Sequence, residues 1–118
     1  METKELMIGN YVLRHTGEIT KVLEVLTSMV RIKAEGYNSI KSITIPSRSI
    51  SPIILTEEHL LKLGFETLVD KFFFCGFSYI KKRGKKFYGG KVLLTYVHEL
   101  QNYYYLHTKE HLYYDFTK

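Results

Sequence analysis

The sequence predicts an α+β protein, and three patterns along its 118 residues support that fold class. Its first third alternates short β-like runs with turn residues, its middle contains a capped helix, and its last third contains a basic hairpin followed by an amphipathic helix. We expect one domain over residues 1–118. Within it, an SH3-like antiparallel β-meander lobe (residues 1–46) is expected to pack with a helix–β-hairpin–helix lobe (residues 53–118).

The meander is expected to contain four strands, over NYVLRH, EITKVLEVL, MVRIKA and IKSITI, with turns at TG, TS and EGYNS. In MVRIKA the apolar residues Val30, Ile32 and Ala34 alternate with two cations, as in a half-buried strand. Ile43 and Ile45 repeat this period of two in KSITI. An open sheet would give the same pattern as an SH3-like half-barrel.

A polar, serine-rich connection, PSRSISP, runs from Pro46 to Pro52 and is expected to end the last strand and separate the two lobes. Thr56 then offers an N-cap oxygen to EEHLLK, and Gly64 is suited to a left-handed C-terminal stop. This pattern predicts a short helix. Its apolar face is expected to contain Leu60, Leu61 and Leu63.

The runs FFFCGFSYI and KFYGGKVLL flank KKRGKK, which predicts a β-hairpin with a basic, glycine-containing turn. A terminal helix follows around YVHELQNYYYLH, and the tail HLYYDF is a candidate for a short final strand. Because a helix turns by about 100° per residue, one side of this helix is predicted to be core. The expected core residues are Tyr96, Val97, Leu100, Tyr103, Tyr104 and His107.

The composition indicates a folded, cytoplasmic chain. Hydrophobic residues make up 45% of it and charged residues 25%, unlike the composition of disordered proteins. The single cysteine, Cys75, cannot form an internal disulfide and is expected to be a small buried side chain in a reducing compartment. No stretch has the h-region of a signal peptide or the roughly 20 apolar residues that cross a bilayer, so no membrane association is expected.

Positive charge is concentrated in the turn KKRGKK. The chain has 17 Lys and Arg against 12 Asp and Glu, a net charge of +5, and this turn alone holds five basic side chains. We expect it to bind an anionic partner, nucleic acid first, with nearby Tyr79, Phe87 and Tyr88 stacking on bases or sugars. The alternative is a solvated tip whose lysines only prevent edge aggregation. The candidate anion-binding residues are Lys81, Lys82, Arg83, Lys85, Lys86 and Tyr88.

The other side of the terminal helix carries a polar stripe without formal charge. Its residues recur at i, i+3, i+4 and i+7, and its amide, imidazole and phenol groups suit a hydrogen-bonding contact with a protein partner. Ordinary exposure to solvent explains the stripe equally well. The candidate partner-contact residues are His98, Gln101, Asn102 and Tyr105.

Two runs near the C-terminus resemble zinc-protease motifs, but neither predicts a metal site. HELQN places Asn102 where H-E-x-x-H requires its second histidine. HTKEH matches H-x-x-E-H, but only seven residues follow His111 to supply a third ligand, so a solvent-exposed helix end is expected instead. Since no nucleophile motif, catalytic carboxylate pair or phosphate-binding loop is recognisable either, we expect no enzyme, no metal and no cofactor.

Three blocks, ELMIGNYV, PIILTEEHLLKLGFE and YVHELQNYYYLHTKE, follow the order and spacing of a family pattern. The chain resembles a family of small uncharacterised proteins encoded in Bacteroidetes genomes and their phages, whose pattern is LRIGNYV, PIPLTEEWLLKLGF and VHQLQNLYFALTGEEL. This resemblance covers both ends and the middle but not the hairpin, and it implies a phage, prophage or mobile-element context without implying an activity. It also implies that the terminal helix ends near Thr108, where TKEHL lacks the capping glycine of TGEEL.

These patterns together predict a non-enzymatic binding or accessory protein of a phage or mobile element that binds an anionic partner through the basic hairpin. One alternative is a protein-interaction or virion-accessory module that uses the terminal helix, including as a homo-oligomer. Another is capture of a small anionic nucleotide ligand, which basic charge alone does not distinguish from nucleic acid.

Overall fold

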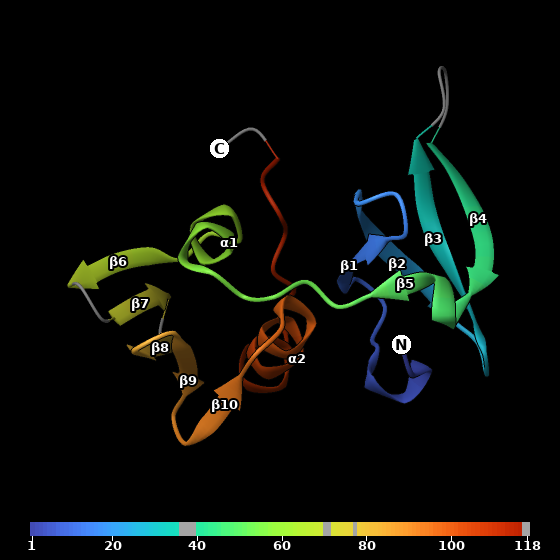
Figure 1. Cartoon of the computed structure of the whole chain (residues 1–118). Coiled ribbons are helices and arrows are strands. Elements are labelled where there is room, and N and C mark those ends of the chain that lie inside the picture. The colour runs from blue at the N-terminus through green and yellow to red at the C-terminus, as the bar shows by residue number, and fades with distance from the viewer. Residues whose placement is uncertain (36–39, 70–71, 77, 117–118) are drawn as a thin grey trace. The chain divides into compact units, whose positions relative to one another are not determined.

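The computed structural model describes residues 1–35, 40–69, 72–76 and 78–116, and these residues form an α+β fold with two antiparallel sheets (Figure 1). The chain divides into two compact units, Met1–Ile53 and Ile54–Lys118. The first unit contains η1 (Thr3–Glu5), β1 (Tyr11–Arg14), β2 (Ile19–Val25), β3 (Met29–Glu35), β4 (Ile40–Pro46), η2 (Ser47–Ser49) and β5 (Ile50–Ser51). The second contains α1 (Glu57–Lys62), β6 (Glu66–Val69), β7 (Phe72–Cys75), β8 (Ser78–Arg83), β9 (Lys86–Gly89), β10 (Val92–Leu94) and α2 (Val97–Thr108).

The sheet of the first unit has the strand order β4-β3-β2-β1-β5. The predicted alternation is confirmed in β3, where Val30 and Ile32 are fully buried, and in β4, where Ile43 and Ile45 are half-buried. The predicted turn at EGYNS and the side chain of Ala34 lie outside the described residues. One apolar core supports this sheet, and its buried residues are Leu6, Val12, Val22, Val30, Ile32 and Ile50.

Beyond β4 the first unit contains an element that the sequence did not indicate. Pro46 is the last residue of β4, as expected for a strand ended by proline. The polar connection after it then forms η2 and the short β5, which pairs antiparallel with β1 through Leu13↔Ser51 and Arg14↔Ile50. Ile50 is 3% exposed and is the one apolar side chain that joins this polar run to the core.

Helix α1 forms where the capping pattern predicts it. The Thr56 hydroxyl accepts a hydrogen bond from the His59 backbone N–H at 3.3 Å, and Gly64 has a φ of 97°. Leu60 and Leu63 are buried, but Leu61 is 41% exposed, so its assignment to the apolar face was wrong. Each residue turns the helix by about 100°, and Leu61 therefore points away from the side that its neighbour Leu60 buries.

The sheet of the second unit has the order β10-β9-β8-β7-β6. The predicted hairpin is present as β8–β9, and its two central residues start with Gly84 at a φ of 61°, as in a type II′ turn. The apolar runs on either side were expected to be single strands, but each contains two. Gly76 and Gly90, with φ values of 60° and 61°, follow β7 and β9 respectively. The helix–hairpin–helix expectation is therefore corrected to a five-stranded sheet with two helices.

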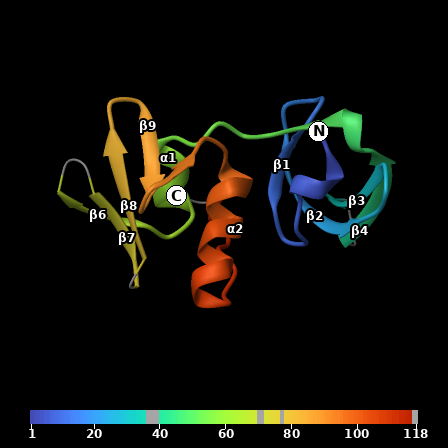
Figure 2. The ribbon, with the colours of Figure 1, turned by 90° about the horizontal axis from the view of Figure 1, so that it is seen from below.

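Both helices lie against the concave face of this sheet (Figures 1 and 2). A Cβ atom on Gly89 would lie 2.6 Å from the Tyr103 ring, so the absence of a side chain at position 89 makes room for this ring against β9. The rings of Phe73 and Phe87 meet edge to face beneath the helices, with centroids 6.2 Å apart. Phe73, Ile80 and Phe87 are buried on this face.

Cys75 lies at the edge of the same face and is half-buried, less enclosed than the sequence indicated. Its Sγ is 3.6 Å from the hydroxyl of Tyr104 on α2. This contact, together with burial, raises the pKa of Tyr104 to about 12. The cysteine therefore packs against α2.

The tail after α2 forms no strand over residues 109–116, contrary to expectation. It instead runs along α1, where the Asp115 N–H donates to the Lys62 carbonyl at 2.7 Å. His59 Nδ1 and the Tyr114 hydroxyl are 2.9 Å apart, and Lys62 Nζ lies 5.7 Å from the centroid of the Tyr114 ring. Burial lowers the pKa of His59, Lys62 lowers it further, and Glu58 opposes the shift.

Helix α2 ends at Thr108, as the resemblance implied, and the end is strained. Lys109 has a φ of 62°, the left-handed conformation that usually requires glycine, and its N–H donates to the Tyr105 carbonyl at 2.8 Å. A lysine is here held in a conformation that costs most residues about 1–2 kcal/mol.

Replacing Gly89 by alanine should destabilise the second unit by about 1–3 kcal/mol, because the added methyl group overlaps the Tyr103 ring. Chemical denaturation with far-UV circular dichroism measures the loss. The double variant Gly89→Ala with Tyr103→Ala is the control, since it removes the ring that the methyl group meets. If Gly89→Ala were as destabilising in the Tyr103→Ala background as in the wild type, this packing would be wrong.

Replacing Lys109 by glycine should stabilise the protein by about 0.5–1 kcal/mol, because glycine adopts the left-handed conformation without strain. Lys109→Ala is the matched control, as it also removes the charge but keeps the strain. Equilibrium unfolding of both variants tests the idea, and equal stability of the two would contradict it.

The lowered pKa of His59 predicts a loss of stability in mild acid. The folded state holds fewer protons than the unfolded state, so the contribution is full above the ordinary pKa of 6.5 and is lost as pH falls below it. His59→Gln keeps a polar partner for Tyr114 but does not titrate. Its free energy of unfolding should therefore fall less than that of the wild type between about pH 7 and pH 5. Parallel curves for the two proteins would refute the prediction.

Candidate nucleic-acid interface

The strand register assigns the basic residues of the hairpin to two different faces. In β8–β9, Lys81 lies opposite Tyr88, and Lys82 lies opposite Phe87. Directly opposed residues of an antiparallel pair point to the same side, and successive residues point to opposite sides. Because Phe87 is 4% exposed on the concave face, Lys82 shares that face and Lys81 lies on the convex one.

Lys82 thus points to the other side of the sheet from Lys81. Its Nζ forms an ion pair with the Glu57 carboxylate, at the start of α1. The structure therefore separates Lys82 from the cations of the convex face. The expectation that Phe87 stacks on a base was wrong as well, since its ring is enclosed against Phe73.

The convex face combines aromatic rings with cations. Phe72 lies opposite Lys81, and Phe74 lies opposite Tyr79. The remaining pairs of the hairpin place Arg83, Lys86 and Tyr88 on the same side. We call this surface the aromatic–basic face, and its residues are Phe72, Phe74, Tyr79, Lys81, Arg83, Lys86 and Tyr88.

The rings of this face are accessible to different degrees. Tyr79 is 53% exposed, while Phe72, Phe74 and Tyr88 are half-buried. The centroids of Phe74 and Tyr79 are 6.3 Å apart at a tilt of 34°. Such a pair covers the open side of the sheet with aromatic surface that no helix of the second unit covers, since both helices lie on the concave face (Figure 2).

The cations of the hairpin other than Lys82 form no ion pair among the described residues. Arg83, Lys85 and Lys86 are exposed, with Lys85 in the turn, and Lys81 is half-buried. Lys81 Nζ lies 5.6 Å from the centroid of the Phe72 ring, a cation–π contact. The carboxylate of Glu66 on β6 also shares the face, opposite Phe74.

The sequence indicated Tyr79 and Tyr88 but missed Phe72 and Phe74. The run FFFC is uniformly apolar, which hides the alternation of its side chains and suggested a buried strand. The alternation becomes visible only once the register assigns Phe73 to the buried side.

The polar stripe of α2 is only partly accessible to a protein partner. His98 is 2% and Gln101 5% exposed, while Asn102 and Tyr105 are half-buried. The His98 ring stacks on Tyr96 at 5.7 Å and 12°. The four candidate residues therefore share one side of the helix, but two of them are inaccessible.

The groups of the zinc-like motifs have other contacts. Glu99, the would-be general base, accepts hydrogen bonds from the Thr95 and Tyr96 backbone N–H groups, both at 2.9 Å, and so caps α2. Beyond the end of the helix, the ring of His111 stacks on Tyr105 at 4.6 Å. Within the described part of the chain, no three His, Cys, Asp or Glu residues are placed to hold a metal ion.

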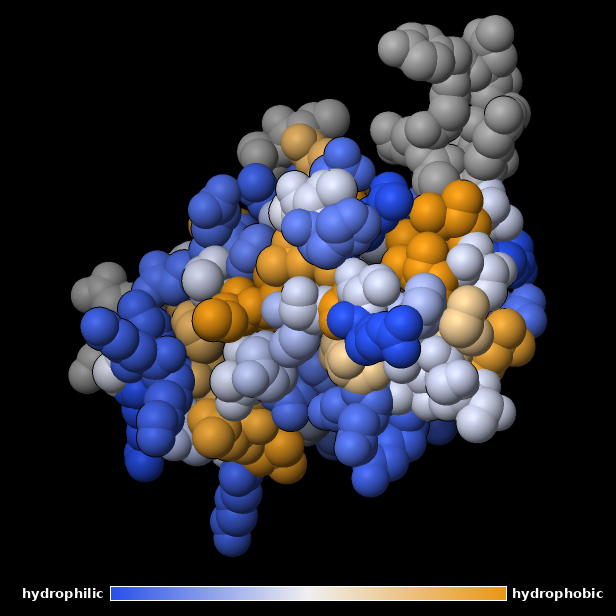
Figure 3. Space-filling view, turned by 45° about the vertical axis from the view of Figure 1, so that its right-hand side comes forward, coloured by the Kyte–Doolittle hydropathy of each residue, from blue (hydrophilic) through white to orange (hydrophobic). Residues whose placement is uncertain are grey.

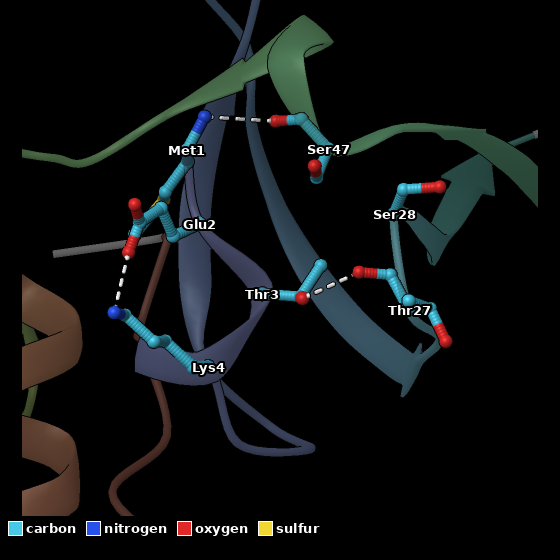
Figure 4. A pocket seen from close by; sticks show the side chains of 7 residues that line it. All are labelled: Met1, Glu2, Thr3, Lys4, Thr27, Ser28 and Ser47. Carbon is cyan, nitrogen blue, oxygen red and sulfur yellow. Dashed lines mark hydrogen bonds and ion pairs between the residues drawn. The ribbon is translucent and has the colours of Figure 1, made fainter.

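An open hollow of about 380 Å³ in the first unit is the other surface feature to consider (Figure 4). Its polar groups mostly contact one another. The amino group of Met1 donates to the Ser47 carbonyl at 3.1 Å, the Thr3 hydroxyl donates to the Thr27 carbonyl at 2.8 Å, and Lys4 pairs with Glu2 at 3.2 Å. The hollow thus offers few groups to a ligand.

Hydrophobic residues also reach the surface. On the side of the molecule in Figure 3 they form separate patches between hydrophilic residues. The most exposed apolar side chains include Ile8 at 61%, Ile54 at 67% and Leu106 at 64%. Isolated apolar side chains of this kind are common on protein surfaces and need no ligand to explain them.

Comparison with known proteins found no matching family model, curated protein or solved structure. Among the helices of the described residues, none has the length and apolar character needed to cross a membrane. The function is therefore argued from the residues of the chain itself.

Proposed function

We propose that this protein is a non-enzymatic, cytoplasmic binding protein of a phage or mobile element, and that it binds nucleic acid through the aromatic–basic face. The observation that carries the proposal is the interleaving of rings and unpaired cations on one open side of a sheet. Nucleic acids offer the matching chemistry, because phosphates alternate with flat, aromatic bases along the strand.

Charge supports an anionic partner. With Lys82 neutralised by Glu57, four cations of the hairpin remain available within two strands and their turn. Cations that serve only solubility need not be clustered in one place. A cluster of charges of one sign raises the local concentration of an oppositely charged ligand. Phosphate contacts of this kind also release counterions, which makes the affinity dependent on salt.

The curvature of the sheet favours a polymer over a small ligand. Small-molecule sites are usually concave and enclose most of the ligand surface. The helices occupy the concave side, and the aromatic–basic face is the convex side (Figure 1). A nucleotide would meet one or two side chains there, whereas a nucleic-acid chain reaches several at once.

We further propose an SH3-like barrel for the first unit. Support comes from its five-stranded antiparallel order, in which the short 3-10 helix η2 precedes β5 and β5 pairs back on β1. SH3-like barrels host many unrelated functions, so the fold of this unit adds no evidence about the partner.

Lys81 and Lys82 provide a matched test, since they are neighbours of the same type on opposite faces of the sheet. Lys81→Ser should weaken oligonucleotide binding and reduce the slope of log affinity against log salt by up to about 0.9, the value for one phosphate contact. Lys82→Ser removes the same charge but should change affinity and slope much less. Fluorescence anisotropy at a series of salt concentrations measures both.

Replacing Lys81, Arg83, Lys85 and Lys86 together by serine should abolish binding, with little change in stability because three of the four side chains are exposed. If the wild-type protein binds no oligonucleotide at low salt, the proposal is wrong. Equal effects of Lys81→Ser and Lys82→Ser would show that the face assignment does not govern binding.

A further inference from the structure

The spacing of the rings on the aromatic–basic face indicates whether a single strand or a duplex fits it. Its rings lie on three neighbouring strands, with Phe74 on β7, Tyr79 on β8 and Tyr88 on β9. Neighbouring strands are about 4.8 Å apart, and side chains at i and i+2 on one strand are about 6.8 Å apart. The centroids of Phe74 and Tyr79, a directly opposed pair on β7 and β8, are 6.3 Å apart.

Bases inside a duplex cannot use such rings. Each base of a duplex is covered on both faces by its neighbours, which follow at about 3.4 Å along a strand. A ring can stack only on a base whose face is free, and rings 6.3 Å apart match bases that have been splayed away from one another. Single strands meet this condition without the cost of opening a duplex.

The width of the sheet also argues against a duplex groove. The major groove, about 12 Å wide, admits a helix or a two-stranded ribbon. Strands β8 and β9 are flanked by β7 and β10, and five strands at about 4.8 Å span far more than that groove. Among the described residues, the turn and the pairs Lys82↔Phe87 and Arg83↔Lys86 lie beyond the last paired residues of β7.

The cations of the face lie between its rings, where the phosphates of a single nucleic-acid strand with splayed bases would pass. Lys81 lies directly between Phe72 on one neighbouring strand and Tyr88 on the other, and Arg83 lies opposite Lys86 toward the turn. A strand whose bases rest on the rings would thus run its phosphates along the same face, within reach of flexible basic side chains.

We infer that the aromatic–basic face binds single-stranded nucleic acid, stacking unpaired bases on Tyr79 and its neighbouring rings while Lys81, Arg83 and Lys86 contact the phosphates. This inference rests on the proposed nucleic-acid function and specifies its ligand. Tyr79 is the critical residue because it is the most exposed ring of the face, at 53%.

The test compares labelled single-stranded oligo-dT and oligo-rU with a duplex of equal length, using the full chain. Single strands should bind more tightly than the duplex. Tyr79→Ala should lower single-strand affinity about five-fold or more, the value of one stacked base, while leaving duplex affinity unchanged. Tyr79→Phe keeps the ring and should bind like the wild type, and thermal unfolding of each variant confirms that it is folded.

The possible results distinguish failure of the stacking inference from failure of the proposed nucleic-acid function. If the duplex binds as tightly as the single strands and only Lys81→Ser weakens binding, the protein binds nucleic acid but the stacking inference is overturned. If Tyr79→Ala binds single strands like the wild type, it is overturned too. Absence of binding to every oligonucleotide rejects the function itself. A preference for oligo-rU over oligo-dT, or the reverse, when both bind more tightly than the duplex, supports the inference.

Discussion

The contact between Gly89 and the ring of Tyr103 sets the arrangement of the second unit. It allows the Tyr103 ring of α2 to lie against β9, where a Cβ atom at position 89 would come within 2.6 Å of that ring and displace it. The helix then covers Phe73, Ile80 and Phe87, and these residues form the buried side of the sheet. Since side chains alternate along each strand, the residues between them must point outward. The open face and its composition are therefore consequences of where the helix packs.

The same constraint sorts the charges of the hairpin. Lys82 points to the same side of the sheet as buried Phe87, which is the side that the helices cover. Its ammonium group forms an ion pair there with Glu57. The partners are 30% and 48% exposed at the side chain, and such a pair contributes little to stability. Its effect is on the distribution of charge. It removes one cation from the field of the hairpin and leaves Lys85 in the turn and Lys81, Arg83 and Lys86 on the convex side.

Local patterns in the sequence were sufficient for elements that depend on local physics. Alternation identified β3 and β4, proline marked the end of β4, and Thr56 with Gly64 bounded α1. Patterns failed where an element depends on distant partners. Strand β5 is two residues long and exists because β1 offers it an edge, and FFFC conceals which phenylalanines are outward until β8 fixes the register. His98 and Gln101 were misjudged for a related reason, since a polar side chain on a helix is not exposed merely because it is polar.

An aromatic face open to solvent carries a risk of aggregation. The cations beside it either reduce that risk or bind a ligand. Rings on an uncovered sheet favour aggregation, and lysines protect against it wherever they are placed nearby. Protection alone would be served best if the charges covered the rings. Lys81 does lie over Phe72, but Tyr79, opposite Phe74 and two residues before that lysine, remains the most exposed ring of the face. The proposed stacking of bases requires an uncovered ring at this position, whereas protection against aggregation does not.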